Sequence, residues 1–250
     1  MQRRREGTRD VDHRKGAPET VPSPLRAGTA VASAYESLLA TLELRRHAPR
    51  LTRLLVTSAQ PGEGKSTVSV QLARTMASSG RRVLLVDGDL RRPTLHRAFS
   101  VSNQRGFADL LAGRAEPKEV LHTVGGGALP DAGVLDLIPS GRVQGNVVSA
   151  LASAGLAALL VALAEHRDFL VLDSPPLLSV DDAGFFAPHV DGVLIVASTG
   201  EAKVQDVRSV RERIEAAGGS VVGVVLNRFD ERLHGASHQP YQAYYQLESH

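Results

Sequence analysis

The chain has 250 residues, of which 42% are apolar, with a formal net charge of +2 and neither cysteine nor tryptophan. This length can bury one substantial core. The missing cysteines exclude a disulfide, a cysteine zinc site and a cysteine nucleophile, and they suit a reducing compartment. The small net charge gives little support to nucleic-acid binding, and no apolar run approaches the roughly 18 residues that a membrane-spanning helix needs.

Residues 1–28 are predicted to be a disordered basic tail. They contain the run from Arg3 to Arg5 and the prolines Pro18, Pro22 and Pro24, without apolar periodicity. Such a segment cannot offset the entropy that ordering would cost. It is either a solvated tail or an electrostatic tether to anionic lipid or an acidic partner.

The next elements surround a glycine-bearing loop. Residues 30–46 have helical apolar spacing, 54–56 form a short buried-type strand, and 68–79 have a helical pattern again. Between the strand and the second helix lies S-A-Q-P-G-E-G-K-S-T, residues 58–67. A strand, such a loop and a helix together predict a phosphate-binding P-loop. The backbone N–H groups of residues 60–64 then form an anion nest, which the helix N-terminus reinforces.

Side chains of this loop suit Mg-ATP. Lys65 can bridge the β- and γ-phosphates, and the hydroxyl of Ser66 can bind Mg²⁺. The alternative is a chance G-K-S sequence at a helix start.

Two further strands end in carboxylates. Residues 82–89, R-V-L-L-V-D-G-D, end in Asp87 and Asp89, and residues 168–176, D-F-L-V-L-D-S-P-P, carry Asp173 at the end of the apolar run. Ligands of open parallel sheets lie at the carboxyl ends of the strands. We therefore expect these aspartates to meet the P-loop, although each could instead be a helix cap or turn residue.

The rest of the chain alternates between helices and strands. We expect a short helix at 107–112, a flexible connection marked by Gly125–Gly127 and Pro130, a strand at 135–138, a long helix at 147–166, a short helix at 181–189, a strand at 192–197, a helix at 201–217 and a strand at 220–226. This order predicts an α/β fold over residues 29–229, with a mainly parallel, doubly wound sheet and helices on both faces.

Residues 230–250 are predicted to be a flexible tail. They contain three of the four tyrosines of the chain, Tyr241, Tyr244 and Tyr245, after a polar, turn-rich stretch. These tyrosines are either a patch that docks on a surface or phosphate acceptors on a tether beside an ATP site.

Taken together, these motifs resemble the bacterial tyrosine kinases of capsule and exopolysaccharide assembly. That family lies within a wider P-loop group that includes partition and division-site ATPases. The matching stretches are 58–67, V-L-L-V-D-G-D-L-R-R-P at 83–93, F-L-V-L-D-S-P-P-L-L-S-V-D-D-A at 169–183, G-V-V-L-N at 223–227 and the tyrosine tail.

The resemblance implies a tyrosine autokinase that uses ATP and Mg²⁺ and modifies its own tail, in trans. It assigns ATP binding to Gln60, Pro61, Gly62, Glu63, Gly64, Lys65, Ser66, Thr67 and Asn227. It assigns catalysis to Lys65, Asp87 and Asp89, metal binding to Ser66, Asp87 and Asp173, phosphate acceptance to Tyr241, Tyr244 and Tyr245, and a contact with phosphate or acceptor to Arg91 or Arg92. Which of Asp87 and Asp89 is the base stays open.

The resemblance also implies partners. We expect a homo-oligomer, a separate membrane-anchored activator of the polysaccharide co-polymerase type, no specific nucleic acid, and a cytoplasmic protein recruited to the inner face of the membrane. The stretch Ser33–Leu39 does not carry one Glu and two Arg at the fixed spacing of the family's ring-forming helix. Two alternatives remain: an ATPase switch of the partition or positioning type, and a catalytically weak nucleotide-binding subunit of a polysaccharide export complex.

Overall fold

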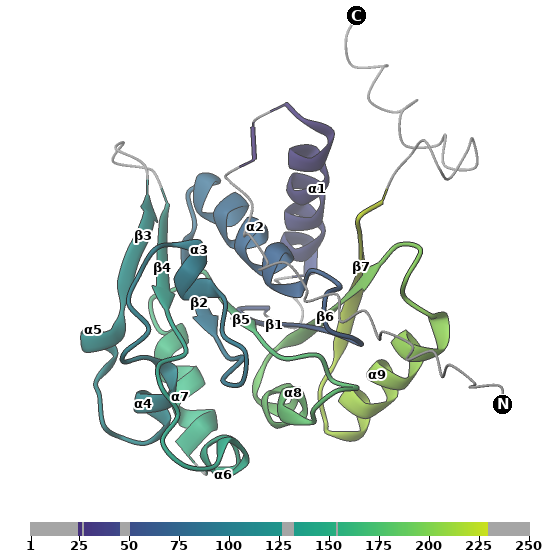
Figure 1. Ribbon diagram of the computed structural model, residues 1–250. Helices are drawn as coiled ribbons and strands as arrows, with labels where there is room; N and C mark the ends of the chain where they lie inside the picture. Colours follow the sequence, from purple (N-terminus) through teal and green to yellow (C-terminus); the bar gives the residue numbers. More distant parts are fainter. Residues whose placement is uncertain (1–24, 27, 46–50, 127–132, 154, 230–250) are drawn as a thin grey trace, which may run out of the picture.

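The computed structural model describes residues 25–26, 28–45, 51–126, 133–153 and 155–229. Its centre is a seven-stranded sheet in the order β3-β4-β2-β5-β1-β6-β7 (Figure 1). The strands are β1 (Arg53–Ser58), β2 (Arg82–Asp87), β3 (His122–Gly126), β4 (Val134–Ile138), β5 (Phe169–Asp173), β6 (Gly192–Ser198) and β7 (Val221–Asn227). The helices are α1 (Ala30–Arg45), α2 (Lys65–Ser78), α3 (Leu95–Ala98), α4 (Phe107–Leu111), α5 (Pro117–Val120), α6 (Val147–Leu151), α7 (Gly155–Ala164), α8 (Asp182–Phe186), the 3₁₀ turn η1 (Ala187–His189) and α9 (Val204–Ala216).

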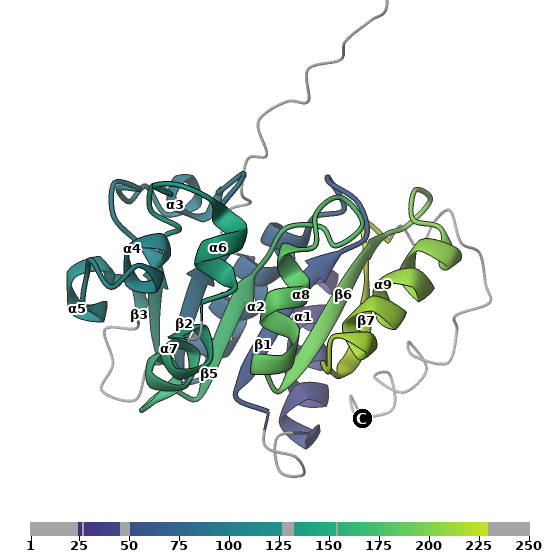
Figure 2. The same ribbon diagram turned by 90° about the horizontal axis from the view of Figure 1, so that it is seen from below.

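Helices cover both faces of the sheet. Figures 1 and 2 show α1 and α2 over one face, and α4 and α6 to α9 over the other. Successive strand residues point to opposite faces, so that Leu54 and Val56 of β1 pack in the core under α1 and α2, while Leu55 packs in the opposite core. The central strands β1, β2, β5 and β6 are therefore buried on both sides, as is typical of parallel sheets. The predicted doubly wound, mainly parallel architecture is confirmed.

The expected loop at Gly125–Gly127 is wrong over its first two residues. β3 extends to Gly126 and pairs with β4, the one antiparallel pairing in the described sheet. Gly125 lies so close to β4 that an added Cβ would be 3.3 Å from the Cβ of Leu135. The glycine here permits close strand packing and is not a sign of a turn.

The expected single helix at 147–166 is also wrong. The structure has two helices, α6 and α7. Asn146 caps α6, since its side chain accepts a hydrogen bond of 2.8 Å from the N–H of Val148. Gly155, which is unfavourable inside a helix, begins α7 instead. The short helix expected at 181–189 is α8 followed by η1.

The sheet order gathers the predicted motifs at one edge. β2, β5 and β1 are neighbours, Asp87 is opposite Asp173 in the register, and Asp173 is opposite Val56 of β1. The carboxyl ends of these three strands, and the loops after them, therefore lie together. The predicted tails at 1–28 and 230–250 lie, apart from residues 25, 26 and 28, outside the described residues. Among the described helices, none is long and apolar enough to cross a membrane.

Candidate active site

The loop between β1 and α2 has a defined conformation. Gly62 and Gly64 have φ of 86° and 89°, in the left-handed region that favours glycine. The carboxylate of Glu63 accepts a 2.7 Å hydrogen bond from the N–H of Gln60, and the carbonyl of Glu63 accepts one of 2.9 Å from the side chain of Asn227. A Cβ on Gly64 would lie 2.1 Å from Nδ2 of Asn227. These hydrogen bonds hold the loop in place, and Asn227 leaves no room for a side chain at Gly64.

Helix α2 begins at Lys65, and its N-terminus lacks a capping side chain. Its first N–H groups are therefore available to an anion, and the helix dipole favours negative charge there. Ser66 is buried and Thr67 half-buried in the first turn, while Gln60, Pro61 and Gly62 are exposed. This arrangement suits a phosphate chain that approaches from solvent.

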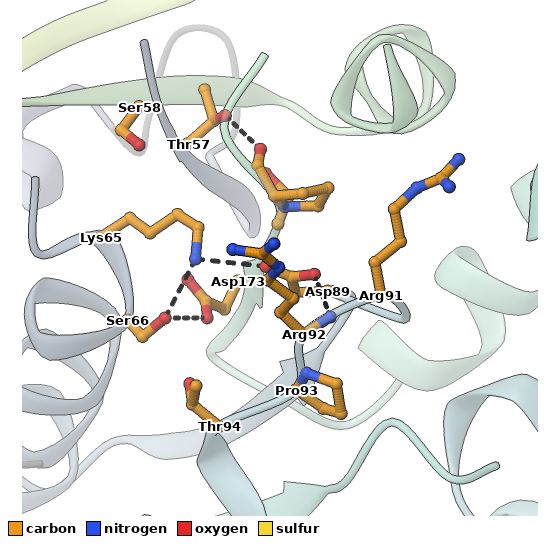
Figure 3. Close-up of polar contacts among 12 residues, drawn as sticks. Thr57, Ser58, Lys65, Ser66, Asp89, Arg91, Arg92, Pro93, Thr94 and Asp173 are labelled. Carbon is orange, nitrogen blue, oxygen red and sulfur yellow. Dashed lines mark hydrogen bonds and ion pairs between the residues drawn. The ribbon is translucent and has the colours of Figure 1, made fainter. Parts of the chain in front are cut away.

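Lys65 and Ser66 connect the P-loop to the strand-end carboxylates (Figure 3). Nζ of Lys65 lies 3.3 Å from Oδ2 of Asp89 and donates a 3.3 Å hydrogen bond to Oγ of Ser66. Oγ of Ser66 in turn donates to Oδ2 of Asp173 at 2.6 Å, and Oγ of Ser69 lies 3.0 Å from the other oxygen of Asp173. The predicted P-loop, Asp pair and single Asp are therefore brought together.

Asp87 is one of two buried carboxyls of the site whose pKa is raised. It is fully buried, and Oδ2 accepts hydrogen bonds from the N–H groups of Thr94 and Leu95 at 3.2 and 3.0 Å. Oδ1 has no hydrogen-bond partner among the described residues. Burial, and then the nearby charge of Asp173, raise the pKa of Asp87 to about 8. Burial also raises the pKa of Asp173, against the opposing influence of Lys65 and Ser66.

These oxygen atoms suit a magnesium ion that arrives with a nucleotide. Within the described chain, no three His, Asp or Glu side chains are arranged to hold a metal by themselves. Mg²⁺ in nucleotide sites commonly takes only one or two protein oxygens, with phosphates and water as the other ligands. The hydroxyl of Ser66, the carboxylate of Asp173 and the orphaned Oδ1 of Asp87 provide such oxygens.

The two consecutive arginines have different surroundings. Nε and Nη2 of Arg91 donate to the two carboxylate oxygens of Asp182 at 2.6 and 3.0 Å. The backbone N–H of Arg92 donates to Asp89 at 2.9 Å, while its guanidinium forms no hydrogen bond or ion pair with any described residue. In Figure 3 Arg91 points away from Lys65, and Arg92 points back over the site.

Two contacts of the site were not predicted from the sequence. One is Ser69, three residues after Ser66 and on the same side of α2. The other is Arg228, whose Nη2 donates to the carbonyl of Gly62 at 2.7 Å. The i,i+3 spacing from Ser66 could have indicated Ser69, whereas the contact of Arg228 depends on how β7 lies beside the P-loop.

A cavity of about 840 Å³ lies between α1 and the end of β7. Asn227 and Arg228 line it as well as contacting the P-loop, and its other walls are mainly apolar, with Val31 and Phe229 among them. Tyr35 also lines it, and burial raises the pKa of this tyrosine to about 12. The tyrosines Tyr241, Tyr244 and Tyr245 lie outside the described residues.

Comparisons with known proteins show which family the chain is similar to. Residues 54–247 match the family model described as the CobQ/CobB/MinD/ParA nucleotide binding domain. The tyrosine-protein kinase CpsD of Streptococcus pneumoniae is 30% identical over 199 residues, which are 78% of this chain and 83% of CpsD. The tyrosine-protein kinase Etk of Escherichia coli is 36% identical over 174 residues, 70% of this chain but 23% of Etk.

The fold is also similar to those of solved kinase and nucleotide-binding structures. The kinase domain of E. coli Etk aligns with a TM-score of 0.72 and 32% identity, covering 80% of this chain and 77% of that domain. The septum site-determining protein MinD of Pyrococcus horikoshii, solved with Mg-ADP, aligns with a TM-score of 0.60 and 25% identity over 73% of each chain.

Proposed function

Since the chain belongs to the bacterial tyrosine-protein kinases, within the CobQ/CobB/MinD/ParA nucleotide-binding family, we propose that it is an ATP-dependent protein tyrosine autokinase. Its acceptors are Tyr241, Tyr244 and Tyr245 in its own C-terminal segment. The observation that carries the proposal is the convergence of Lys65, at the start of α2, with Asp89 and Asp173 at the carboxyl ends of two neighbouring strands.

In this proposal the P-loop holds the phosphates of ATP. The N–H groups of residues 62–67 and the ammonium of Lys65 bind the phosphate oxygens, while Asn227 and the apolar cavity beside it receive the base. Ser66, Asp87 and Asp173 hold Mg²⁺, which would neutralise charge on the phosphates. The orphaned Oδ1 of Asp87 supports this role, because a buried carboxylate oxygen without a donor favours a cation.

The transfer step follows from this placement. The phenol oxygen of a tail tyrosine attacks the γ-phosphorus, the bond from that phosphorus to the bridging oxygen breaks, and ADP leaves. A phenol with a pKa near 10 is a weak nucleophile at neutral pH. A carboxylate of the Asp87 and Asp89 pair accepts its proton. Arg92, whose guanidinium points over the site and forms no hydrogen bond or ion pair with any described residue, steadies charge on the transferred group.

The proposal extends to the partners of the protein. We propose that the chain acts as a homo-oligomer in which the tail of one copy enters the site of another. A separate membrane-anchored protein of the polysaccharide co-polymerase type recruits it to the inner face of the membrane and activates it. Its phosphorylation state would then regulate capsule or exopolysaccharide synthesis and export.

The test is incubation of the full chain with Mg-ATP, followed by intact-mass and peptide mass spectrometry. The variants are Lys65→Met, the triple Phe variant of the tail tyrosines, and Lys203→Met, which removes an exposed lysine beside α9 as the matched control. We expect phosphate on the tail in the wild type and in the control, and in neither other variant. A candidate activator's cytoplasmic peptide should raise the rate. ATP hydrolysis without phosphotyrosine in every sample would refute the proposal in favour of an ATPase switch, and ATP binding without turnover would favour a regulatory subunit.

A further inference from the structure

The ion pair between Arg91 and Asp182 lies at the border of the site. Both nitrogen–oxygen contacts are short, at 2.6 and 3.0 Å, and the carboxylate side chain is only 3% exposed while the arginine is 40% exposed. Two parallel N–H···O bonds of this kind fix orientation as well as distance. The pair is therefore a rigid connection with one end buried in the protein.

The pair joins two segments that both carry site residues. Arg91 follows β2 and lies two residues after Asp89, which contacts Lys65. Asp182 is the first residue of α8, in the segment that follows β5 and Asp173. At their starts the same two segments are joined by the N–H of Gly88, which donates to the carbonyl of Asp173 at 2.8 Å. The ion pair between Arg91 and Asp182, here called the bridge, joins the two segments a second time, further from the strand ends.

Asp89 is held between these two connections. One of its oxygens accepts the N–H of Arg92, and the other lies near Nζ of Lys65. The turn after β2 therefore transmits any shift of Arg91 to the carboxylate of Asp89 and to the direction of Arg92. An exposed turn without such a connection would be free to move these groups relative to Lys65.

We infer that Arg91 is a positioning residue, which fixes the turn after β2 on α8 through Asp182 and so places Asp89 and Arg92 for phosphoryl transfer; this role in the reaction rests on the proposed function. Arg91 does not itself contact the phosphates. Releasing it for such a contact would leave the buried carboxylate of Asp182 uncompensated, which is strongly unfavourable. Arg91 thus positions the turn, while Arg92 contacts the transferred phosphate.

The test compares Arg91→Lys, Asp182→Asn and the double variant with the wild type. Lysine keeps the charge but cannot form the two-pronged pair. The control is Arg53→Lys, which weakens another half-buried pair, that between Arg53 and Asp191, at the opposite ends of the strands. The readouts are kcat and KM for ATP in tail phosphorylation, and amide hydrogen exchange of residues 88–94 in the nucleotide-free chain.

We expect Arg91→Lys and Asp182→Asn each to lower kcat about 10- to 100-fold, as small misplacements of reacting groups do, with KM for ATP changed less than about twofold because the P-loop is intact. The double variant should be no worse than the more affected single one, because both changes remove the same bridge. Exchange of residues 88–94 should accelerate in all three variants. Arg53→Lys should lower thermal stability without changing kcat or that exchange.

Several results would overturn the inference. They are a raised KM with unchanged kcat in Arg91→Lys, losses that multiply in the double variant, and exchange at 88–94 that equals the wild type. A wild-type chain without phosphotyrosine would overturn the proposed function instead. The exchange measurement needs no ATP and would still support the bridge between the two segments, so the two failures are distinguishable.

Discussion

Replacing Asp87 by asparagine is expected to stabilise the nucleotide-free protein at alkaline pH while abolishing phosphoryl transfer. Burial and the charge of Asp173 raise the pKa of Asp87 from 3.8 to about 8. Between these values the unfolded chain has lost a proton that the folded chain still holds, so the stability of the wild type falls as pH rises from about 4 to about 8. Each pKa unit corresponds to about 1.4 kcal/mol, which gives a total loss of about 6 kcal/mol, of which about 5 kcal/mol is reached by pH 8.

The asparagine variant avoids this loss, because its side chain does not ionise. Its amide NH₂ would replace an oxygen that has no partner among the described residues, at a pH-independent cost of about 1–3 kcal/mol. Asp87→Asn should therefore be neutral or destabilising near pH 5 and stabilising by about 2–4 kcal/mol near pH 8.

Urea unfolding followed by far-ultraviolet circular dichroism, in EDTA from pH 5 to 8.5, measures this difference. Asp191→Asn is the control. Although burial opposes it, hydrogen bonds from Arg53 and from the N–H of Thr52 lower the pKa of Asp191, so the stability from Asp191 is lost only below about pH 4. Asp191→Asn should destabilise equally across the whole range. A stability difference between Asp87→Asn and wild type that does not change with pH would refute the reasoning.

Three further predictions concern the loop, the cavity and the first turn of α2. Gly64→Ala, whose Cβ would lie 2.1 Å from Asn227, should weaken ADP binding at least about tenfold in calorimetry; Gly62→Ala, with a φ of 86° but open space around it, reports the backbone strain alone, and equal losses would contradict the clash. Tyr35→Phe should remove the tyrosinate transition at about pH 12 and the fall in stability between about pH 10 and 12; a titration like that of wild type would contradict its burial. Ser69→Ala, which removes a contact to the carboxylate at the end of β5, should raise the Mg²⁺ concentration for half-maximal activity with KM for ATP unchanged; an unchanged Mg²⁺ requirement would refute that role.

Sequence reasoning predicted the architecture where local pattern and tertiary environment agree. β1, β2, β5 and β6 are continuous apolar runs, as expected of strands buried on both faces. It failed where one residue type has two uses. Gly125 and Gly126 are typical of a turn, yet both lie in β3, where Gly125 permits close packing on β4. The apolar stretch that begins at Val147 has no proline to mark the break between α6 and α7.

The site was predicted to a similar depth. Asp87, Asp89 and Asp173 could be placed together because the carboxyl ends of adjacent parallel strands must meet. Their partners could not. The pairing of Arg91 with Asp182 depends on where α8 packs, 91 positions further along the chain. Pattern thus locates charges at an edge of a sheet, whereas tertiary packing decides which of them are neutralised.

Whether a buried carboxylate is fully paired decides how it affects the protein. Asp182 is buried but fully paired, so it can hold a turn in place. Asp87 is buried with one oxygen unpaired and with Asp173 nearby, so burial and the charge of Asp173 raise its pKa, and its ionised form destabilises the empty protein. Mg²⁺, bound together with the phosphates of ATP, would relieve the repulsion between the carboxylates of Asp87 and Asp173. This relief would add to the affinity for Mg-ATP. The unpaired oxygen of Asp87 lies near Asp173 and Lys65, where such a cation would bind it.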